Sequence, residues 1–179
     1  DTLGTRGWTA LYLENHDQPR SVSRFGDPSR YWYESATALA TAYFLQRGTP
    51  FIYQGQEIGM LGGEFSTVVD FHDVESVSYM ERLGINKVPK GLAAMSRDNG
   101  RTPMQWDSSP AAGFSEAVPW IDVPASAEHI NVAAQADDPH SILTYYRALI
   151  HARHVIPALS DGTFTRIDTS VPALFVYRR

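Results

Sequence analysis

The stretch WTALYLENHDQPR, residues 8–20, changes abruptly from β-forming side chains to polar and turn-forming ones. The apolar and aromatic residues up to Leu13 favour a buried β-strand. Pro19 lacks the N–H that a sheet ladder needs, so this strand is expected to end near His16 or Asp17. An acid, an imidazole, two amides and a guanidinium therefore follow the carboxyl end of a strand. Active sites of α/β proteins lie at that end of their strands.

The next segment predicts a helix and then a second strand. Residues 30–47 contain no Gly or Pro and are rich in Ala and Leu, which favours a helix. Ser29 is expected to cap its first turn, and Gly48 is expected to end it in the left-handed conformation. Residues 49–53 are a short apolar run before the polar residues 54–57, which is typical of a buried parallel strand. The result is a βαβ unit whose polar strand ends share one edge.

The remaining sequence is expected to be rich in loops. Gly and Pro recur throughout residues 58–125, where one helix is expected at 73–83. Asp138 and Pro139 are expected to start a helix whose apolar face runs through residues 141–154.

Two short strands are expected at residues 163–167 and 173–177, on either side of a Pro-containing turn. They indicate the beginning of a separate β domain. Two parallel strands do not complete a sheet, and two strands are not a domain. We therefore expect the chain to be part of a larger α/β protein.

Composition excludes several classes of function. The 179 residues have a formal net charge of −5 and no block of Lys or Arg, which argues against a nucleic-acid partner. No apolar stretch is long enough to cross a membrane and no signal peptide is visible, so a cytoplasmic protein is expected. Cysteine is absent, and the His residues lack metal-ligand spacing. No metal or cofactor is therefore expected.

The two strand ends carry the first candidate site residues. Asp17 beside His16 and Arg20 is interpreted as functional, although an Asp that merely closes a turn is common. His16 could instead serve a structural hydrogen bond, and Arg20 could pair with Asp17 or with Asp27. At the second strand end, Gln54 and Glu57 are candidates, because Gly55 between them allows the backbone to turn close to a ligand. Glu57 is expected to be a buried, paired carboxylate behind the site.

Residues 96–107, SRDNGRTPMQWD, form a third dense polar segment. Arg97 and Arg101 could bind sugar hydroxyls or a carboxylate through their planar guanidinium groups. The alternative is a loop network that satisfies only itself.

These three segments together resemble the α-amylase superfamily of glycoside hydrolases (glycoside hydrolase family 13), in its oligo-1,6-glucosidase and α-glucosidase branch. The resemblance rests on residues 13–27, 48–60 and 96–107, with looser similarity at 112–114, 130–132 and 141–153. It implies a partial (β/α)8 TIM barrel, namely its last two βα units, and the start of an antiparallel C-terminal β domain. Residues 1–158 would then be the barrel part, with a long loop region at 58–137, and residues 159–179 an incomplete β-sandwich.

The resemblance also implies roles for single residues. Asp17 matches the carboxylate that stabilises the transition state by binding two hydroxyls of the innermost sugar, and His16 matches an imidazole that binds the same sugar. Arg97 matches a pocket arginine, with Arg101 as the second choice. Gln54, Glu57 and Arg20 would support the site from behind, and Gln56 stands where this branch usually has Glu.

The nucleophilic Asp and the acid/base Glu of this family lie on earlier strands, and no segment here matches them. The implied function is part of a retaining α-glucosidase acting on α-1,6 or α-1,4 bonds of short oligosaccharides, with the chain alone inactive and able to self-associate through exposed barrel surface. Sucrose isomerase, trehalose-6-phosphate hydrolase and dextran glucosidase remain alternatives within the family. A non-catalytic barrel used for protein interaction and a carbohydrate-binding module remain alternatives outside that activity.

Overall fold

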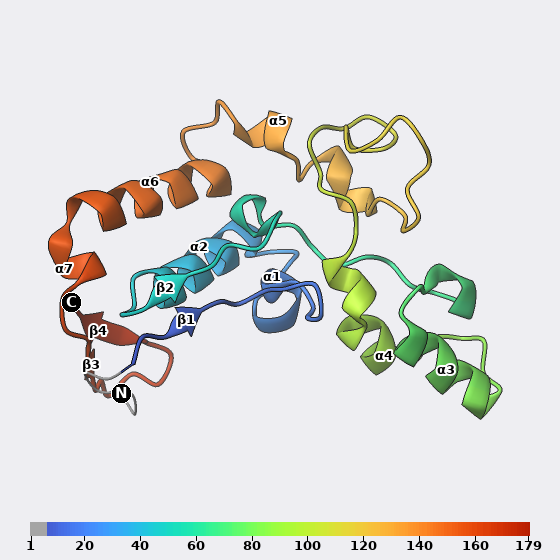
Figure 1. Ribbon diagram of the computed structural model, residues 1–179, viewed down its shortest axis with the longest axis horizontal. Coiled ribbons are helices and arrows are strands. Elements are labelled where there is room, and N and C mark those ends of the chain that lie inside the picture. Colours follow the sequence, from blue (N-terminus) through green and yellow to red (C-terminus); the bar gives the residue numbers. More distant parts are fainter. Residues whose placement is uncertain (1–6) are drawn as a thin grey trace.

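The computed structural model describes residues 7–179 and contains a short parallel strand pair on the side of the molecule where both termini lie (Figure 1). Strand β1 (Ala10–Leu11) pairs in parallel with β2 (Thr49–Pro50), with Ala10 opposite Thr49. Backbone N–H groups of Thr49 and Phe51 donate to the carbonyls of Thr9 and Leu11, each at 2.8 Å. The predicted parallel pairing is confirmed, although both strands are shorter than expected. Pro50 has no N–H to donate, which limits the ladder.

Helix α2 (Trp32–Phe44) connects the two strands and completes the predicted βαβ unit. The expected cap at Ser29 is wrong, because its N–H and hydroxyl both donate to Asp27 Oδ1, at 2.9 and 2.8 Å. The expected end at Gly48 is also wrong, since the C-cap is Leu45. Gly48 has φ = 148° and lies so close to β1 that a Cβ there would be 2.5 Å from the Thr9 carbonyl oxygen. Gly48 therefore allows the segment before β2 to lie close against the β1 backbone, and it does not end helix α2.

Helix α6 (Ile142–Val155) packs against α2 and closes the main hydrophobic core. Its N-cap is Ser141, whose Oγ accepts a hydrogen bond from the Thr144 N–H at 3.1 Å. The expected start at Asp138 and Pro139 is therefore wrong by a few residues. The core between the helices is built from the following buried side chains: Val22, Ala36, Ala40, Tyr43, Phe44, Ile142, Tyr146 and Leu149.

Short helices occupy much of the region that was expected to be loop. The helix predicted at 73–83 is confirmed as α3 (Val74–Leu83), and with α4 (Lys90–Met95) it forms an arm on the side of the molecule away from both termini (Figure 1). The further helical segments are α1 (Ser21–Phe25), η1 (Gln56–Ile58), η2 (Val68–Asp70), α4 (Lys90–Met95), η3 (Arg97–Gly100), η4 (Ala125–Glu128), α5 (Val132–Gln135) and α7 (Pro157–Ser160).

The last residues form an antiparallel pair, β3 (Thr165–Ile167) and β4 (Val176–Arg178), close to the two expected strands. The Tyr177 hydroxyl donates to the carbonyl of Thr41 at 2.6 Å, which ties this hairpin to α2. Within residues 7–179, no helix is both long and apolar enough to cross a membrane.

Candidate active site

A buried ion pair holds the loop that follows β1. Arg20 Nη1 lies 3.1 Å from Glu14 Oε2, and both side chains are almost completely buried. Glu14 Oε1 accepts from the backbone N–H of Ser21 at 2.8 Å, so the carboxylate closes the loop on both sides. Arg20 Nη1 also donates to the carbonyl of Gln54 at 2.6 Å. The pair therefore joins the two strand ends and leaves residues 15–18 at the exposed tip of the loop.

These contacts replace the partners that were considered for Arg20. Arg20 pairs with neither Asp17 nor Asp27, because Glu14 lies behind the loop and provides the buried partner. Gln54 contributes its backbone carbonyl to this pair. Glu14 was missed because a single acid inside an apolar strand gives no sequence signal of which distant cation it will meet.

Glu57 follows the second strand end, as expected, but it is not paired as expected. Its Oε2 atom is buried and has no hydrogen-bond partner among the described residues. Burial raises the pKa of the Glu57 carboxyl, against the opposing effects of the backbone N–H groups of Glu57 and Gly55 and the charge of Arg20.

Neighbouring Gln56 is buried and donates to the hydroxyls of Tyr43 and Tyr146, at 3.0 and 2.9 Å. Desolvation by burial raises the pKa of the Tyr43 hydroxyl to about 12.

Asp17 lies at the exposed tip, where two segments distant in sequence meet. Its side chain is 49% exposed, and Arg101 Nη2 donates to its Oδ1 at 2.8 Å. Arg97 Nη1 lies 3.9 Å from the same oxygen, and His16 Nε2 lies 3.3 Å from Oδ2. The turn at this tip is closed by Asn15, whose Oδ1 accepts from the backbone N–H of Asp17 at 2.8 Å, so the Asp17 carboxylate is left for the contacts with His16 and the arginines. The structure thus brings His16, Asp17, Arg97 and Arg101 together, with Arg101 rather than Arg97 in direct contact.

Arg97 is held mainly by Asp73, the N-cap of α3. Arg97 Nε donates to Asp73 Oδ1 at 2.9 Å, and Nη2 donates to the same oxygen at 2.5 Å. Burial raises the pKa of the Asp73 carboxyl, but hydrogen bonds from Ser76 and Arg97 outweigh it, so that the pKa is lowered. The hydrogen bond to Asp73 in turn raises the pKa of Arg97. The sequence indicated Asp73 as a helix start and gave no sign of its contact with the site.

Asp98 fastens the segment of the two arginines to the loop before α3. Its side chain is completely buried, and Oδ2 accepts from the N–H groups of His72 and Asp73, at 2.7 and 2.8 Å. One carboxylate oxygen therefore fixes the position of the residue that holds Arg97.

Replacing Asp98 with Ala is expected to lower the free energy of unfolding by about 2 kcal/mol, because two buried N–H groups would lose their acceptor. Chemical denaturation of the two proteins measures this difference. Asp122→Ala, in an exposed carboxylate without such bonds, is the control. Equal stability of Asp98→Ala and the parent would contradict the assigned role.

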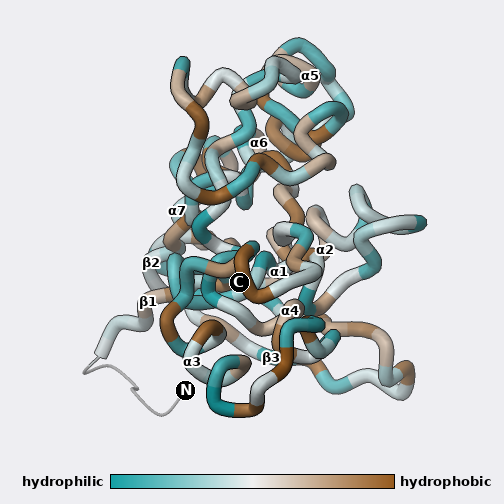
Figure 2. Tube along the Cα trace, turned by 90° about the vertical axis from the view of Figure 1, so that its right-hand side faces the viewer, coloured by the Kyte–Doolittle hydropathy of each residue, from teal (hydrophilic) through white to brown (hydrophobic). Residues whose placement is uncertain are grey.

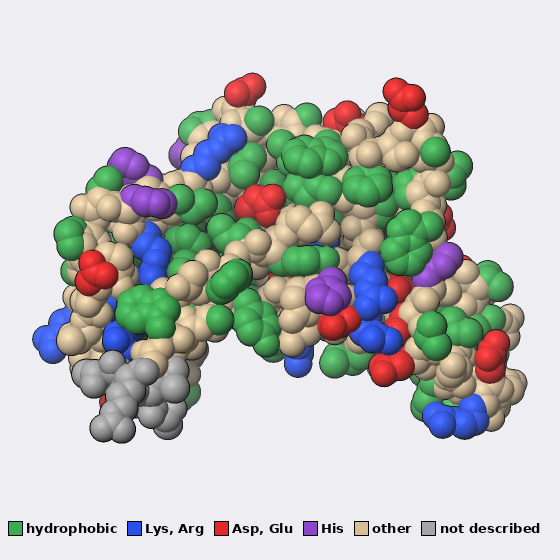
Figure 3. All heavy atoms as spheres, viewed as in Figure 1, with side chains coloured by type: hydrophobic (Ala, Val, Ile, Leu, Met, Phe, Trp, Pro, Cys, Tyr) green, Lys and Arg blue, Asp and Glu red, His purple; other side chains and the backbone are tan. Residues whose placement is uncertain are grey.

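On the face of the molecule drawn in Figure 3, basic and acidic side chains lie next to one another, and a His side chain lies on either side of the basic ones. Chemically, a carboxylate at such a place can accept hydrogen bonds from two neighbouring hydroxyls, while the guanidinium groups donate to others. Neutral polyols such as sugars present that pattern of donors and acceptors.

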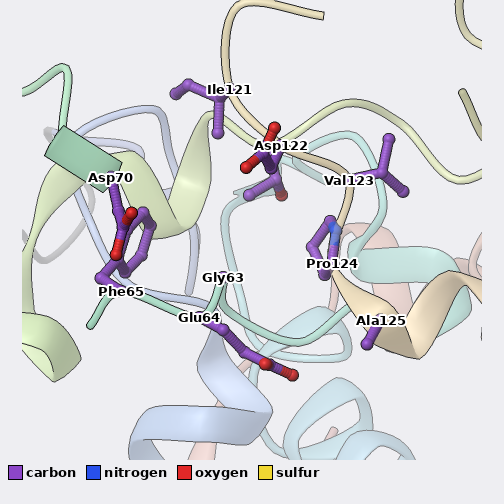
Figure 4. A pocket seen from close by; sticks show the side chains of 10 residues that line it. Gly63, Glu64, Phe65, Asp70, Ile121, Asp122, Val123, Pro124 and Ala125 are labelled. Carbon is purple, nitrogen blue, oxygen red and sulfur yellow. The ribbon is translucent and has the colours of Figure 1, made fainter. Parts of the chain in front are cut away.

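A separate hollow of about 280 Å³ lies between residues 63–65, Asp70 and residues 121–125 (Figure 4). The carboxylate of Asp70 is already used by the N–H groups of Ser66 and Thr67, each at 2.7 Å. None of the candidate site residues lines this hollow.

Comparison with known proteins identifies the family to which this arrangement belongs. Residues 1–162 match the family model described as the catalytic domain of α-amylase. The chain belongs to the α-amylase family. The resemblance inferred from the three polar segments is therefore confirmed.

Individual members of the α-amylase family are similar along almost the entire chain. The oligo-1,6-glucosidase of Parageobacillus thermoglucosidasius is 44% identical over 99% of the chain, which covers 33% of that protein. The trehalose-6-phosphate hydrolase of Bacillus subtilis (strain 168) is 40% identical over 97% of the chain, which covers 32% of that protein. The chain thus spans about a third of the length of the curated relatives it matches.

Solved structures of the family agree with the α/β fold. A mutant of isomaltulose synthase from Erwinia rhapontici NX5, in complex with its natural substrate sucrose, has a TM-score of 0.89 and 43% identity. A mutant of the trehalulose synthase MutB has a TM-score of 0.89 and 44% identity. In each comparison 98% of this chain and 33% of the other are covered.

Proposed function

We propose that this chain supplies part of the sugar-binding pocket of a retaining α-glucosidase that hydrolyses α-1,6 or α-1,4 bonds in short oligosaccharides. The observation that carries the proposal is the carboxylate of Asp17, exposed at a strand end between His16 and the guanidinium of Arg101. The similarity to oligo-1,6-glucosidases supports this activity. We place the enzyme in the cytoplasm, and expect no metal or cofactor to be needed.

The proposed architecture follows the βαβ unit. Residues 1–158 would form the last two βα units of a (β/α)8 barrel, with the long loop region 58–137 at its mouth. Residues 159–179 would begin a β-sandwich domain. The parallel pairing of β1 with β2 and the antiparallel pairing of β3 with β4 support this division. The nucleophilic Asp and the acid/base Glu would come from a part of the barrel outside these residues.

In the proposed reaction, Asp17 acts on the glucose unit whose bond is broken. A retaining glycosidase passes through an oxocarbenium-like transition state, in which positive charge develops on the sugar ring. Hydroxyl groups on that ring then become stronger donors, so a fixed carboxylate binds the transition state more tightly than the substrate. His16 would hydrogen-bond the same sugar. Arg101 would orient the Asp17 carboxylate, and Arg97, fixed by Asp73, would bind a further hydroxyl of the glucose.

Expression of the complete polypeptide that contains this chain tests the proposal. Isomaltose, maltose, sucrose and trehalose 6-phosphate are incubated with it, and the products are followed by NMR. Release of glucose as the α-anomer from isomaltose or maltose is expected. Conversion of sucrose to an isomer would favour the second candidate, a sucrose isomerase, which the similarity to isomaltulose and trehalulose synthases supports. No turnover of any of the four sugars would refute both.

We also infer that residues 1–179 associate with copies of themselves when produced alone. Large apolar side chains directly after β1 and β2 and in the last hairpin are about half exposed, among them Tyr12, Phe51 and Phe175. Apolar segments are spread over the whole trace in Figure 2. Exposed apolar surface of this extent favours association. Sedimentation equilibrium measures the mass of the chain, and a monodisperse monomer would contradict the prediction.

A further inference from the structure

Trp120 stands out from the loop region as an exposed aromatic side chain with a fixed position. Trp120 is 62% exposed, whereas the next residue, Ile121, is buried. Pro119 precedes it and restricts the backbone on the other side. A flexible surface tryptophan would have neither anchor. The chain thus holds a large apolar ring in contact with solvent.

The indole ring packs against His72, which comes from the loop before α3. The ring centroids of Trp120 and His72 lie 5.2 Å apart, with an angle of 79° between the ring planes. This edge-to-face geometry is one of the two arrangements that aromatic pairs favour. The backbone N–H of His72 is itself bound by the buried carboxylate of Asp98, at 2.7 Å. Both residues of the ring pair are therefore anchored to buried side chains, Ile121 on one side and Asp98 on the other.

His72 links the ring pair to the candidate active site through the next residue, Asp73. His72 is followed by Asp73, whose carboxylate holds Arg97, and Arg97 Nη1 lies 3.9 Å from Asp17 Oδ1. Asp17, Arg97, Asp73, His72 and Trp120 follow one another through these contacts. A substrate bound at Asp17 that extended in this direction would pass Arg97 and reach the indole. Asp17 and Asp73 accept hydrogen bonds and Arg97 donates them, a mixture that suits a neutral, hydroxyl-rich chain better than an anion or a cation.

We propose that Trp120, held by His72, is a stacking platform for a sugar ring on the leaving-group side of the substrate. This inference rests on the proposed glucosidase function and adds the substrate class: oligosaccharides with at least two sugar units beyond the bond that is cleaved. The C–H face of a pyranose ring is apolar and packs on the flat face of an indole, while the ring hydroxyls remain at its edge. Pre-formed aromatic surface binds with little loss of conformational freedom.

The test compares two substrates of the complete polypeptide. Isomaltotriose has a two-sugar leaving group, whereas α-glucosyl fluoride has a leaving group without a ring. We expect Trp120→Ala to lower the ratio of kcat/KM for isomaltotriose to that for α-glucosyl fluoride about tenfold. Trp120→Phe is expected to keep most of the ratio, because it retains an aromatic face. His72→Phe should likewise keep the ratio, since it retains the edge-to-face partner.

Trp8→Ala is the matched control, because Trp8 is also half exposed but precedes β1, at the opposite end of the strand from Asp17. It should leave the ratio unchanged within about twofold, which is about 0.4 kcal/mol. If Trp120→Ala hydrolyses both substrates with an unchanged ratio, the platform is refuted and the glucosidase function stands. If the unsubstituted polypeptide hydrolyses neither substrate, the proposed function fails, and the platform fails with it.

Discussion

Replacing Asp17 with Asn is expected to lower kcat/KM for α-glucosides about a thousandfold in the complete enzyme, which corresponds to about 4 kcal/mol of transition-state stabilisation. Asn has the same shape but lacks the negative charge that would face the developing cation and the ring hydroxyls. Loss of the charge also removes the ion pair with Arg101, whose Nη2 lies 2.8 Å from Oδ1. Initial rates with isomaltose and with α-glucosyl fluoride give the measurement.

The fold should survive this substitution, because the Asp17 side chain is 49% exposed and supports no buried group. Circular dichroism and the unfolding midpoint of Asp17→Asn should therefore match those of the parent. Asp168→Asn is the control for a change of net charge, since that carboxylate is 96% exposed and lies on the last hairpin. A loss of less than about tenfold in the Asp17 variant would show that its carboxylate does not stabilise the transition state.

Much of the scaffold follows from local sequence patterns. The apolar run before Asn15, the Ala-rich segment and the run at residues 49–53 predict the βαβ unit, and the structure confirms it. The exact helix ends do not follow, because they depend on competition for hydrogen bonds. Ser29 would be a good cap, but Asp27 takes both its N–H and its hydroxyl. The close contact of Gly48 with β1 likewise arises only after the chain has folded.

The candidate site shows the same division between local and distant information. Each of its polar segments is visible in the sequence, because runs of acids, amides and arginines interrupt the apolar pattern. The choice between Arg97 and Arg101 as the partner of Asp17 is not visible. It depends on Asp73, which binds Arg97 and thereby leaves the short contact with Asp17 to Arg101. Partners separated by more than twenty residues are fixed by tertiary packing, about which residue type and spacing carry little information.

Replacing Arg20 with Met is expected to destabilise the protein by about 3–5 kcal/mol, the largest effect on stability that the site offers. The substitution would leave the buried carboxylate of Glu14 without its cation, while the apolar stem of Met fills much of the same space. It would also remove the hydrogen bond from Arg20 to the Gln54 carbonyl, which joins the two strand ends. The unfolding midpoint in urea and its slope give the change in free energy.

A double substitution separates the charge from the shape of this pair. Glu14→Gln keeps an oxygen that can accept from the Ser21 N–H. It also removes the buried negative charge that Arg20→Met alone would leave unpaired. The double variant should therefore be more stable than Arg20→Met alone, whereas Arg166→Met, at an exposed ion pair, should cost almost nothing. The double variant should nevertheless lose activity, because the loop that presents Asp17 is no longer tied to the second strand end. Full activity in a stable double variant would mean that the position of Asp17 does not depend on the Glu14–Arg20 pair.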